Sequence, residues 1–126
     1  MPDTLETYPT VTPYLVVPDA DAELAFLKAA FGATESMCHR NPDNTVMHAE
    51  IQVGNSLIML GQATDASRAR KAAFYIWVPN VDGVYAKALA AGATSESTPE
   101  DKPYGHRNAG VIDTSGNTWW IGSPVK

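Results

Sequence analysis

The sequence predicts an α+β fold in which two copies of one βαβββ module form a curled mixed sheet with the helices outside. Three short phrases recur along the chain in the same order and at a nearly constant offset, which indicates an internal repeat. The single domain of residues 1–126 therefore divides into a first module at 8–62 and a second at 71–124. The recurring pairs are Val17-Pro18 with Val78-Pro79, Gly32-Ala33-Thr34 with Gly92-Ala93-Thr94, and Gly54-Asn55-Ser56 with Gly116-Asn117-Thr118.

Each module opens with a strand that leads into a capped helix. The runs 11–17 and 74–78 are rich in the β-branched and aromatic residues that favour strands. Asp19 and Asn80 follow these runs, and both side chains can accept hydrogen bonds from the free amides at a helix start. The sequence therefore predicts a helix directly after each of the two residues.

The helices carry one apolar stripe each and end at a glycine. In the first helix, Leu24, Leu27 and Phe31 follow helical spacing, and the second helix repeats this pattern. Gly32 and Gly92 come next, and glycine enters the left-handed conformation that ends a helix without a side-chain clash.

Three short strands follow each helix, with Pro99 to Gly105 as one of the turns between them. Neither module can bury its apolar sheet face well alone, so the two sheets are expected to pair and to enclose a cavity on the concave side. The predicted strands lie at about 33–40, 45–53 and 56–61 in the first module and at about 94–98, 107–113 and 117–122 in the second.

Composition excludes several classes of function. Hydrophobic residues make up 44% of the chain and charged residues 18%, as in a packed globular domain. The net charge of −5 and the lack of a basic stripe argue against nucleic-acid binding. No run approaches the ~20 apolar residues of a membrane span, and no secretion signal precedes the domain. With a single cysteine, Cys38, that cannot form an internal disulfide, we expect a cytoplasmic protein.

Several phrases, taken together, resemble the vicinal oxygen chelate superfamily, which includes glyoxalase I, bleomycin-resistance proteins and extradiol dioxygenases. The closest likeness is to a bacterial branch named after a phosphonate-operon protein. The resemblance implies a homodimer, because modules of this superfamily often pair across chains. The phrases are Pro13-Tyr14-Leu15, Ala30-Phe31-Gly32-Ala33, Met47-His48-Ala49-Glu50, Tyr104-Gly105-x-Arg107 and Gly116-Asn117-x-Trp119-Trp120-Ile121.

The metal ligands of that superfamily have no counterpart here. Its enzymes hold a divalent metal with His and Glu side chains on the first and last strands of the modules. The resemblance places these positions at Thr12, Ile58, Ala73 and Trp120, none of which is a good ligand. We therefore expect no metal and no other cofactor at the usual site.

His48 and Glu50 leave an alternative open. Two residues apart on a strand, they point to one face and could hold a displaced metal or act as base and orienter. They are equally compatible with a plain polar strand face. The opposite face would then supply the core through Met47, Ala49, Ile51 and Val53.

The tryptophans are candidates for ligand contact. An aromatic ring at Trp120, where the metal-binding glutamate is expected, would turn a chelating site into an apolar stacking surface. Trp77 and Trp119 could serve the same surface, since adjacent strand residues face opposite sides. Alternatively, these side chains fill the core.

Tyr104 and Arg107 lie before and at the start of the second-module strand at 107–113. Arg107 could clamp a carboxylate or phosphate through its planar guanidinium. It could equally pair with Asp101 or Asp113.

Two functions follow from these observations. The first is a metal-independent protein that binds a small, partly aromatic molecule in the concave cavity, as bleomycin-resistance proteins do. The second is a metal-dependent lyase or dioxygenase that uses displaced ligands such as His48 and Glu50. The missing last-strand carboxylate favours the first, and the sequence leaves open whether the protein is an enzyme.

Overall fold

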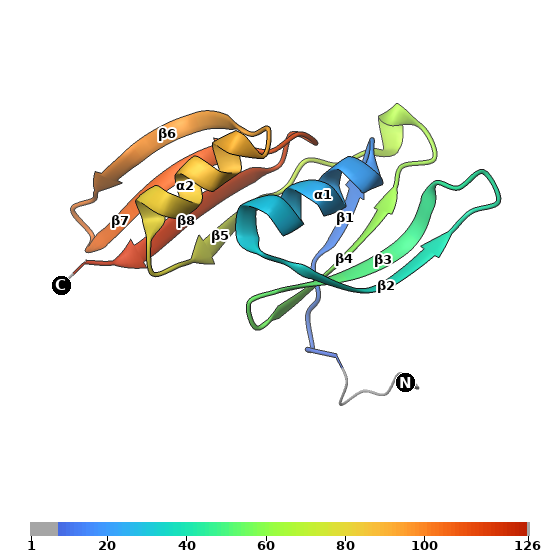
Figure 1. The fold of residues 1–126 in the computed structure, drawn as a ribbon, viewed down its shortest axis with the longest axis horizontal. Coiled ribbons are helices and arrows are strands. Elements are labelled where there is room, and N and C mark those ends of the chain that lie inside the picture. The colour runs from blue at the N-terminus through green and yellow to red at the C-terminus, as the bar shows by residue number, and fades with distance from the viewer. Residues whose placement is uncertain (1–7, 126) are drawn as a thin grey trace.

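The computed structural model describes residues 8–125 and contains both βαβββ modules (Figure 1). The first module consists of β1 (Tyr14–Val17), α1 (Ala20–Phe31), β2 (Thr34–Arg40), β3 (Val46–Val53) and β4 (Ser56–Gln62). The second consists of β5 (Ala73–Trp77), α2 (Val81–Ala90), β6 (Thr94–Asp101), β7 (His106–Ile112) and β8 (Thr118–Pro124). The linker between them contains one turn of 3-10 helix, Ala66–Arg68, that the sequence did not predict.

Each module forms its own four-stranded mixed sheet, with strand orders β1-β4-β3-β2 and β5-β8-β7-β6. The first strand of each module runs parallel to the last, and the other pairs are antiparallel. The two-module α+β architecture is therefore confirmed. Between the two sheets no hydrogen-bonded ladder forms in the described part of the chain, so one chain alone does not make the expected continuous sheet. The modules meet instead through α1 and α2, which pack side by side over one shared hydrophobic core.

The helix ends follow the predicted chemistry. The side chain of Asp19 accepts a hydrogen bond from the amide of Ala22, and that of Asn80 accepts one from Gly83. Gly32 ends α1 in the left-handed conformation with φ of 67°, whereas α2 is capped one residue before Gly92, at Ala91 with φ of −84°. These contacts satisfy backbone groups that a helix terminus leaves unpaired.

The strand β6 is longer than predicted, because it continues through Pro99 to Asp101 where the sequence predicted a turn. β6 is an edge strand, and its pairing with β7 shifts register between Ser97 and Glu100. A proline has no amide proton to offer a neighbouring strand, so it is tolerated at an edge or irregularity. The turn starts only after Asp101.

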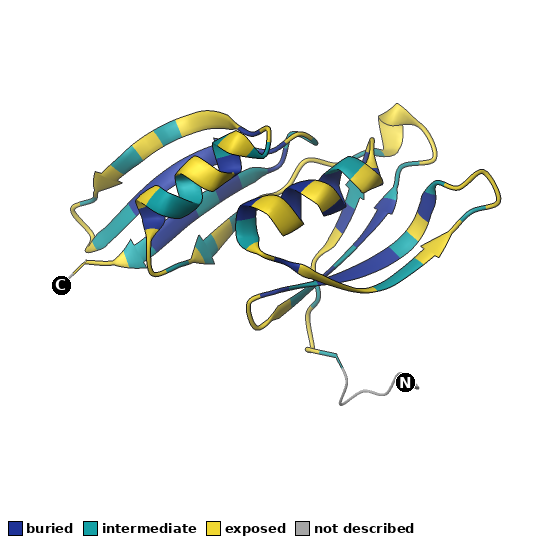
Figure 2. Cartoon of the chain, in the orientation of Figure 1, coloured by how far each residue is buried: buried dark blue, intermediate teal, exposed yellow. Residues whose placement is uncertain are grey.

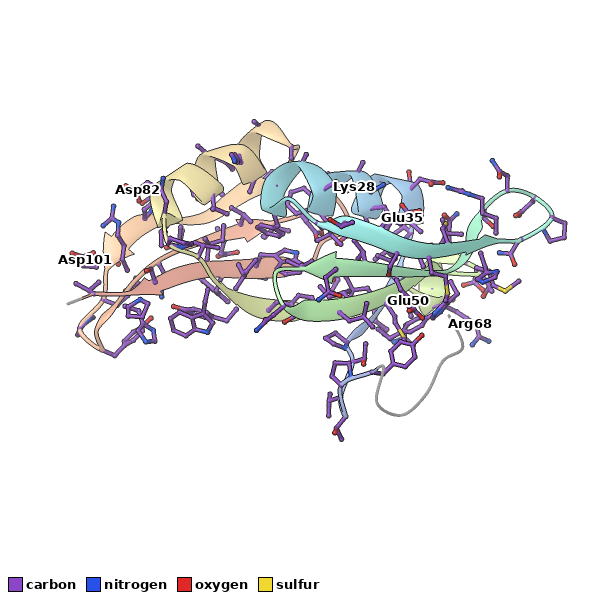
Figure 3. The ribbon with its side chains drawn as sticks, turned by 60° about the horizontal axis from the view of Figure 1, so that its bottom comes forward. Lys28, Glu35, Glu50, Arg68, Asp82 and Asp101 are labelled. Carbon is purple, nitrogen blue, oxygen red and sulfur yellow. The ribbon has the colours of Figure 1, made fainter. Side chains whose placement is uncertain are left out.

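Both helices cover the same side of the sheets, and we call the uncovered side the open face (Figures 2 and 3). Strand residues alternate between the two sides: Ala49, Ile51 and Val53 are buried under α1 as predicted. Met47 was predicted to join them, and this is wrong, since its side chain is 54% exposed. The cause is local, because the pairing of β3 with β2 shifts register between His48 and Val46 and leaves Met47 as an extra, unpaired residue.

Candidate functional site

Trp119 and Trp120 point to opposite sides of the second sheet. Trp119 is 2% exposed and lies in the core, where its ring stacks on Phe74 at a centroid distance of 4.5 Å. Its indole Nε1 donates to the carboxylate of Asp113 at 2.8 Å. Trp120 is half-buried and lies on the open face. Of the two readings that the sequence left open, core filling therefore holds for Trp119, while Trp120 is available to a ligand.

Two glycines make room for aromatic rings on the open face. A β-carbon at Gly110, which pairs with Trp120 across β7 and β8, would lie 2.6 Å from the indole ring. A β-carbon at Gly122 would lie 2.2 Å from the hydroxyl oxygen of Tyr75. Since real side-chain carbons do not approach so closely, only glycine lets both rings lie flat on the sheet. These two glycines are a sequence signal for the site that the analysis above did not use.

A cluster of aromatic rings surrounds His106 beside Trp120. The rings of Trp77, Tyr104 and Tyr75 have their centroids 4.8, 5.1 and 5.9 Å from that of His106. Trp77 and Tyr104 are 55% and 62% exposed, so the structure places both at the surface rather than in the core. Large aromatic groups exposed together on one face are typical of a binding surface.

A cavity of about 360 Å³ lies over the second sheet, and we call it the sheet hollow. Ser97, Asn108 and Lys102 contribute polar groups beside the tyrosine hydroxyls, and a hydrogen bond from Lys102 to Glu100 raises the pKa of the lysine. The sequence analysis missed four of its lining residues because strand register alone brings them together. The lining consists of Tyr75, Ser97, Lys102, Tyr104, Asn108 and Trp120.

A second cavity of about 400 Å³, the junction cleft, lies between the turn joining β3 to β4 and the strand β5. Tyr75, Trp77 and Trp119 are among the residues that line it. Tyr75 lines both cavities, so its ring belongs to the sheet hollow and to the junction cleft alike.

His48 and Glu50 lie on the open face of the first module, as their spacing predicted. The imidazole Nε2 of His48 is 2.9 Å from the carboxylate of Glu50 (labelled in Figure 3), which is only 6% exposed. The hydroxyl of Tyr8 donates to the same carboxylate at 3.0 Å. Both partners come from within the chain, and together they satisfy a carboxylate that would otherwise be buried without compensation.

The residues of the open face do not fit a metal centre. The positions that superfamily enzymes use carry threonine, alanine and Trp120, and the ladder pairs Met59 with Tyr14 as it pairs Trp120 with Tyr75. Trp120 therefore corresponds to Met59 in the first module, one residue from the predicted Ile58. Within residues 8–125, no group of three or more His, Cys, Asp or Glu side chains could hold a metal ion. Thioether and indole groups are no substitute for the carboxylate and imidazole ligands of such a centre.

Arg107 lies on the helix-covered side of the second module, away from the sheet hollow. Its guanidinium bonds Asp82 of α2 at 3.0 Å and Asp101 of β6 at 3.1 Å (both labelled in Figure 3). The bond to Asp82, followed by that to Asp101, raises the pKa of Arg107. The predicted alternative of an ion pair with Asp101 is confirmed, and the sequence did not predict the second partner.

None of the described helices is long and apolar enough to cross a membrane.

Comparisons with known proteins place this chain in a family. The model of the Glyoxalase/Bleomycin resistance protein/Dioxygenase superfamily matches residues 8–121. An uncharacterized protein of Mycobacterium bovis, Mb0911c, is 30% identical over 129 residues, which span 94% of this chain and 85% of that protein.

Solved structures agree with this assignment. TioX from Micromonospora sp. ML1 is 25% identical with a TM-score of 0.73, over 94% of this chain and 98% of that one. A glyoxalase/bleomycin resistance protein/dioxygenase family enzyme from Burkholderia phytofirmans shares the fold, at 23% identity and a TM-score of 0.72, over 91% and 96% of the two chains. The chain belongs to the glyoxalase/bleomycin resistance protein/dioxygenase superfamily.

Proposed function

We propose that this protein binds a small, partly aromatic molecule on the open face of its second module, without a metal ion. The observation that carries the proposal is Trp120, whose ring forms part of the sheet hollow, at the position where the family resemblance implies a metal-binding glutamate. Burial of a flat ring against this indole, with offset stacking, supplies the binding free energy.

Among the residues predicted to contact a ligand, the geometry ranks some above others. Trp120 and Tyr104 line the sheet hollow, and Trp77 extends the same aromatic surface. Trp119 supports the sheet from the core, and Arg107 holds α2 to β6 through its ion pairs. His48 and Glu50 could contact only a ligand that reaches the first module.

No observation favours the alternative of a metal-dependent lyase or dioxygenase built on His48 and Glu50. A catalytic metal site needs about three protein ligands and an open position. Within the described residues this pair has no third ligand, and the carboxylate of Glu50 already binds Tyr8.

We further propose that the protein is a cytoplasmic homodimer of the phosphonate-operon-protein-like branch. Two large apolar side chains on the open face of the first module, Tyr14 and Met47, are at least half exposed. A second copy laid against this part of the face would remove their apolar surface from water and leave the sheet hollow of the second module open. Light scattering on the purified protein should give twice the chain mass of 13.5 kDa. A mass of 13.5 kDa at high protein concentration would contradict the dimer.

The binding proposal is tested by titrating coumarin and indole, two flat bicyclic probes, into isotope-labelled protein and following amide shifts by NMR. The largest shifts are expected on β7 and β8 around Gly110 and Trp120. Replacing Trp120 by leucine keeps an apolar side chain but removes stacking, so the dissociation constants of both probes should rise roughly tenfold.

The matched control is Tyr85→Phe, which removes a hydroxyl on the helix-covered side that bonds Ser95 at 2.7 Å. This variant should bind both probes like the wild type. If neither probe shifts the amides of β7 and β8, the proposed binding site is wrong.

A further inference from the structure

The polar groups of the sheet hollow indicate which aromatic ligands it accepts. We propose that the hollow selects flat aromatic molecules that carry a hydrogen-bond acceptor. The reason is that the amide of Asn108 donates to the hydroxyl oxygen of Tyr104, which leaves the hydroxyl proton of Tyr104 free to bond a ligand. The inference rests on the proposed function and adds the chemical class of the ligand. The contacts of three side chains, Asn108, Tyr75 and Tyr104, carry it.

Asn108 is a buried amide beneath two tyrosine hydroxyls. Its side chain is 3% exposed, and its Nδ2 donates to Tyr104 at 2.9 Å and to Tyr75 at 3.4 Å. Its Oδ1 is buried and accepts no hydrogen bond from the described residues. The amide therefore acts on the hollow only as a donor, with both of its protons directed at phenol oxygens.

This donation fixes what each phenol can offer. A tyrosine hydroxyl has one proton and can also accept, so an oxygen that accepts from an amide turns its own proton elsewhere. The hydroxyl of Tyr75 lies 3.3 Å from Nδ1 of His106, which can take its proton. The proton of Tyr104 has no acceptor within residues 8–125, and its side chain is 62% exposed at the hollow.

The charged groups that line the hollow also favour a ligand with a hydrogen-bond acceptor. Lys102 lines it with an ammonium group, another donor, and its partner Glu100 is not among the lining residues. No carboxylate lines the cavity. A carbonyl or ring heteroatom of a ligand stacked on Trp120 would therefore meet donors, whereas a ligand N–H or O–H would lack an acceptor of comparable strength.

The two probes named above separate these cases, since coumarin has acceptor oxygens and no donor, and indole has an N–H donor and no comparable acceptor. We expect wild-type protein to bind coumarin more tightly than indole. Tyr104→Phe keeps the ring and removes the hydroxyl, so it should weaken coumarin about fivefold and leave indole within twofold. Tyr85→Phe is again the matched control and should change neither.

A second variant replaces the donor amide of Asn108 with an acceptor. Asn108→Asp places a carboxylate under both tyrosines, so their hydroxyl protons turn to it and their lone pairs face the hollow. This variant should lose affinity for coumarin and gain affinity for indole, with circular dichroism confirming that it is folded.

The outcomes separate the inference from the proposed function. If both probes bind on β7 and β8 but Tyr104→Phe leaves the coumarin affinity unchanged, or indole binds more tightly to the wild type, the acceptor preference is wrong while the aromatic site stands. If neither probe binds there, the proposed function itself fails.

Discussion

Replacing Glu23 with glutamine is expected to raise the free energy of unfolding at pH 8 by about 2–4 kcal/mol. Glu23 lies on α1 and is fully buried, and neither of its carboxyl oxygens accepts a hydrogen bond from the described residues. Burial, followed by the neighbouring carboxyl of Asp113, raises its pKa from an ordinary value of 4.5 to about 8. The native protein therefore holds this group protonated at neutral pH.

Glu23 belongs to the first module and Asp113 to the second, so this pair of carboxyl groups lies where the two modules meet. Asp113 lies in the turn between β7 and β8, and it accepts bonds from the amides of Ser115 and Asn117, each at 2.9 Å, as well as from the indole of Trp119. A protonated Glu23 can donate to the Asp113 carboxylate, and a glutamine amide can do the same without a titrating proton. The substitution thus keeps a group that can donate to Asp113 and removes the energetic penalty of ionisation.

The direction of the pH dependence follows from this raised pKa. The unfolded chain loses the Glu23 proton near pH 4.5, whereas the native protein keeps it up to about pH 8. Stability from this group is fully present below pH 4.5 and is lost as the pH rises through that window, by up to about 1.4 kcal/mol per pH unit. Urea unfolding of the wild type between pH 5 and 8 should therefore show falling stability, and Glu23→Gln should remove much of that slope.

The matched control is Glu35→Gln on β2. Glu35 forms a surface ion pair with Lys28 at 2.8 Å, and pairs of this kind contribute about 1 kcal/mol or less. This variant should keep the wild-type slope between pH 5 and 8. A Glu23→Gln protein less stable than the wild type at pH 8 would contradict the buried carboxyl pair.

Substitution of the two adjacent tryptophans should change the free energy of unfolding to very different extents. Trp119→Ala removes a buried ring that packs on Phe74 and Phe31, and we expect it to lower the free energy of unfolding by about 3–5 kcal/mol. Because small domains unfold with only about 5–15 kcal/mol, the variant should be close to unfolding at 37 °C.

Trp119→Phe separates packing from hydrogen bonding. It keeps an aromatic ring and loses the bond to Asp113, so we expect an intermediate loss of about 1–3 kcal/mol. Trp120→Leu on the open face should change stability by less than about 1.5 kcal/mol while it weakens probe binding. Equal stability losses in Trp119→Ala and Trp120→Leu would contradict the assignment of the two rings to opposite faces.

The sequence predicted the modules because their determinants are local. Asp19 and Asn80 are recognisable as caps, and Gly32 as a helix end, since each acts on neighbouring backbone. The extension of β6 through Pro99 was missed because it depends on this strand being at the sheet edge, which is a property of the whole sheet.

The site was predicted only in part, for a similar reason. Residue alternation showed that Trp119 and Trp120 face opposite sides, but deciding which one meets the core required the position of α1, through Phe31. The contact of Asn108 with Tyr75 joins β7 to β5 across β8, and no spacing in the sequence reports it. The proximity of Glu23 to Asp113 likewise depends on how the modules pack, so no pattern in the helix sequence indicated that this glutamate would be buried beside another carboxyl group.

The most direct test of metal-independent binding is a coumarin titration of two preparations of the purified protein. One has its metals removed by a chelator, and the other is incubated with manganese, iron, nickel and zinc and then desalted. We predict the same dissociation constant in both preparations, and no stoichiometric metal by mass spectrometry in either. About one ion held per chain, with coumarin binding or conversion only in the metal-loaded protein, would contradict the account and make a metal-dependent enzyme of this superfamily the leading explanation.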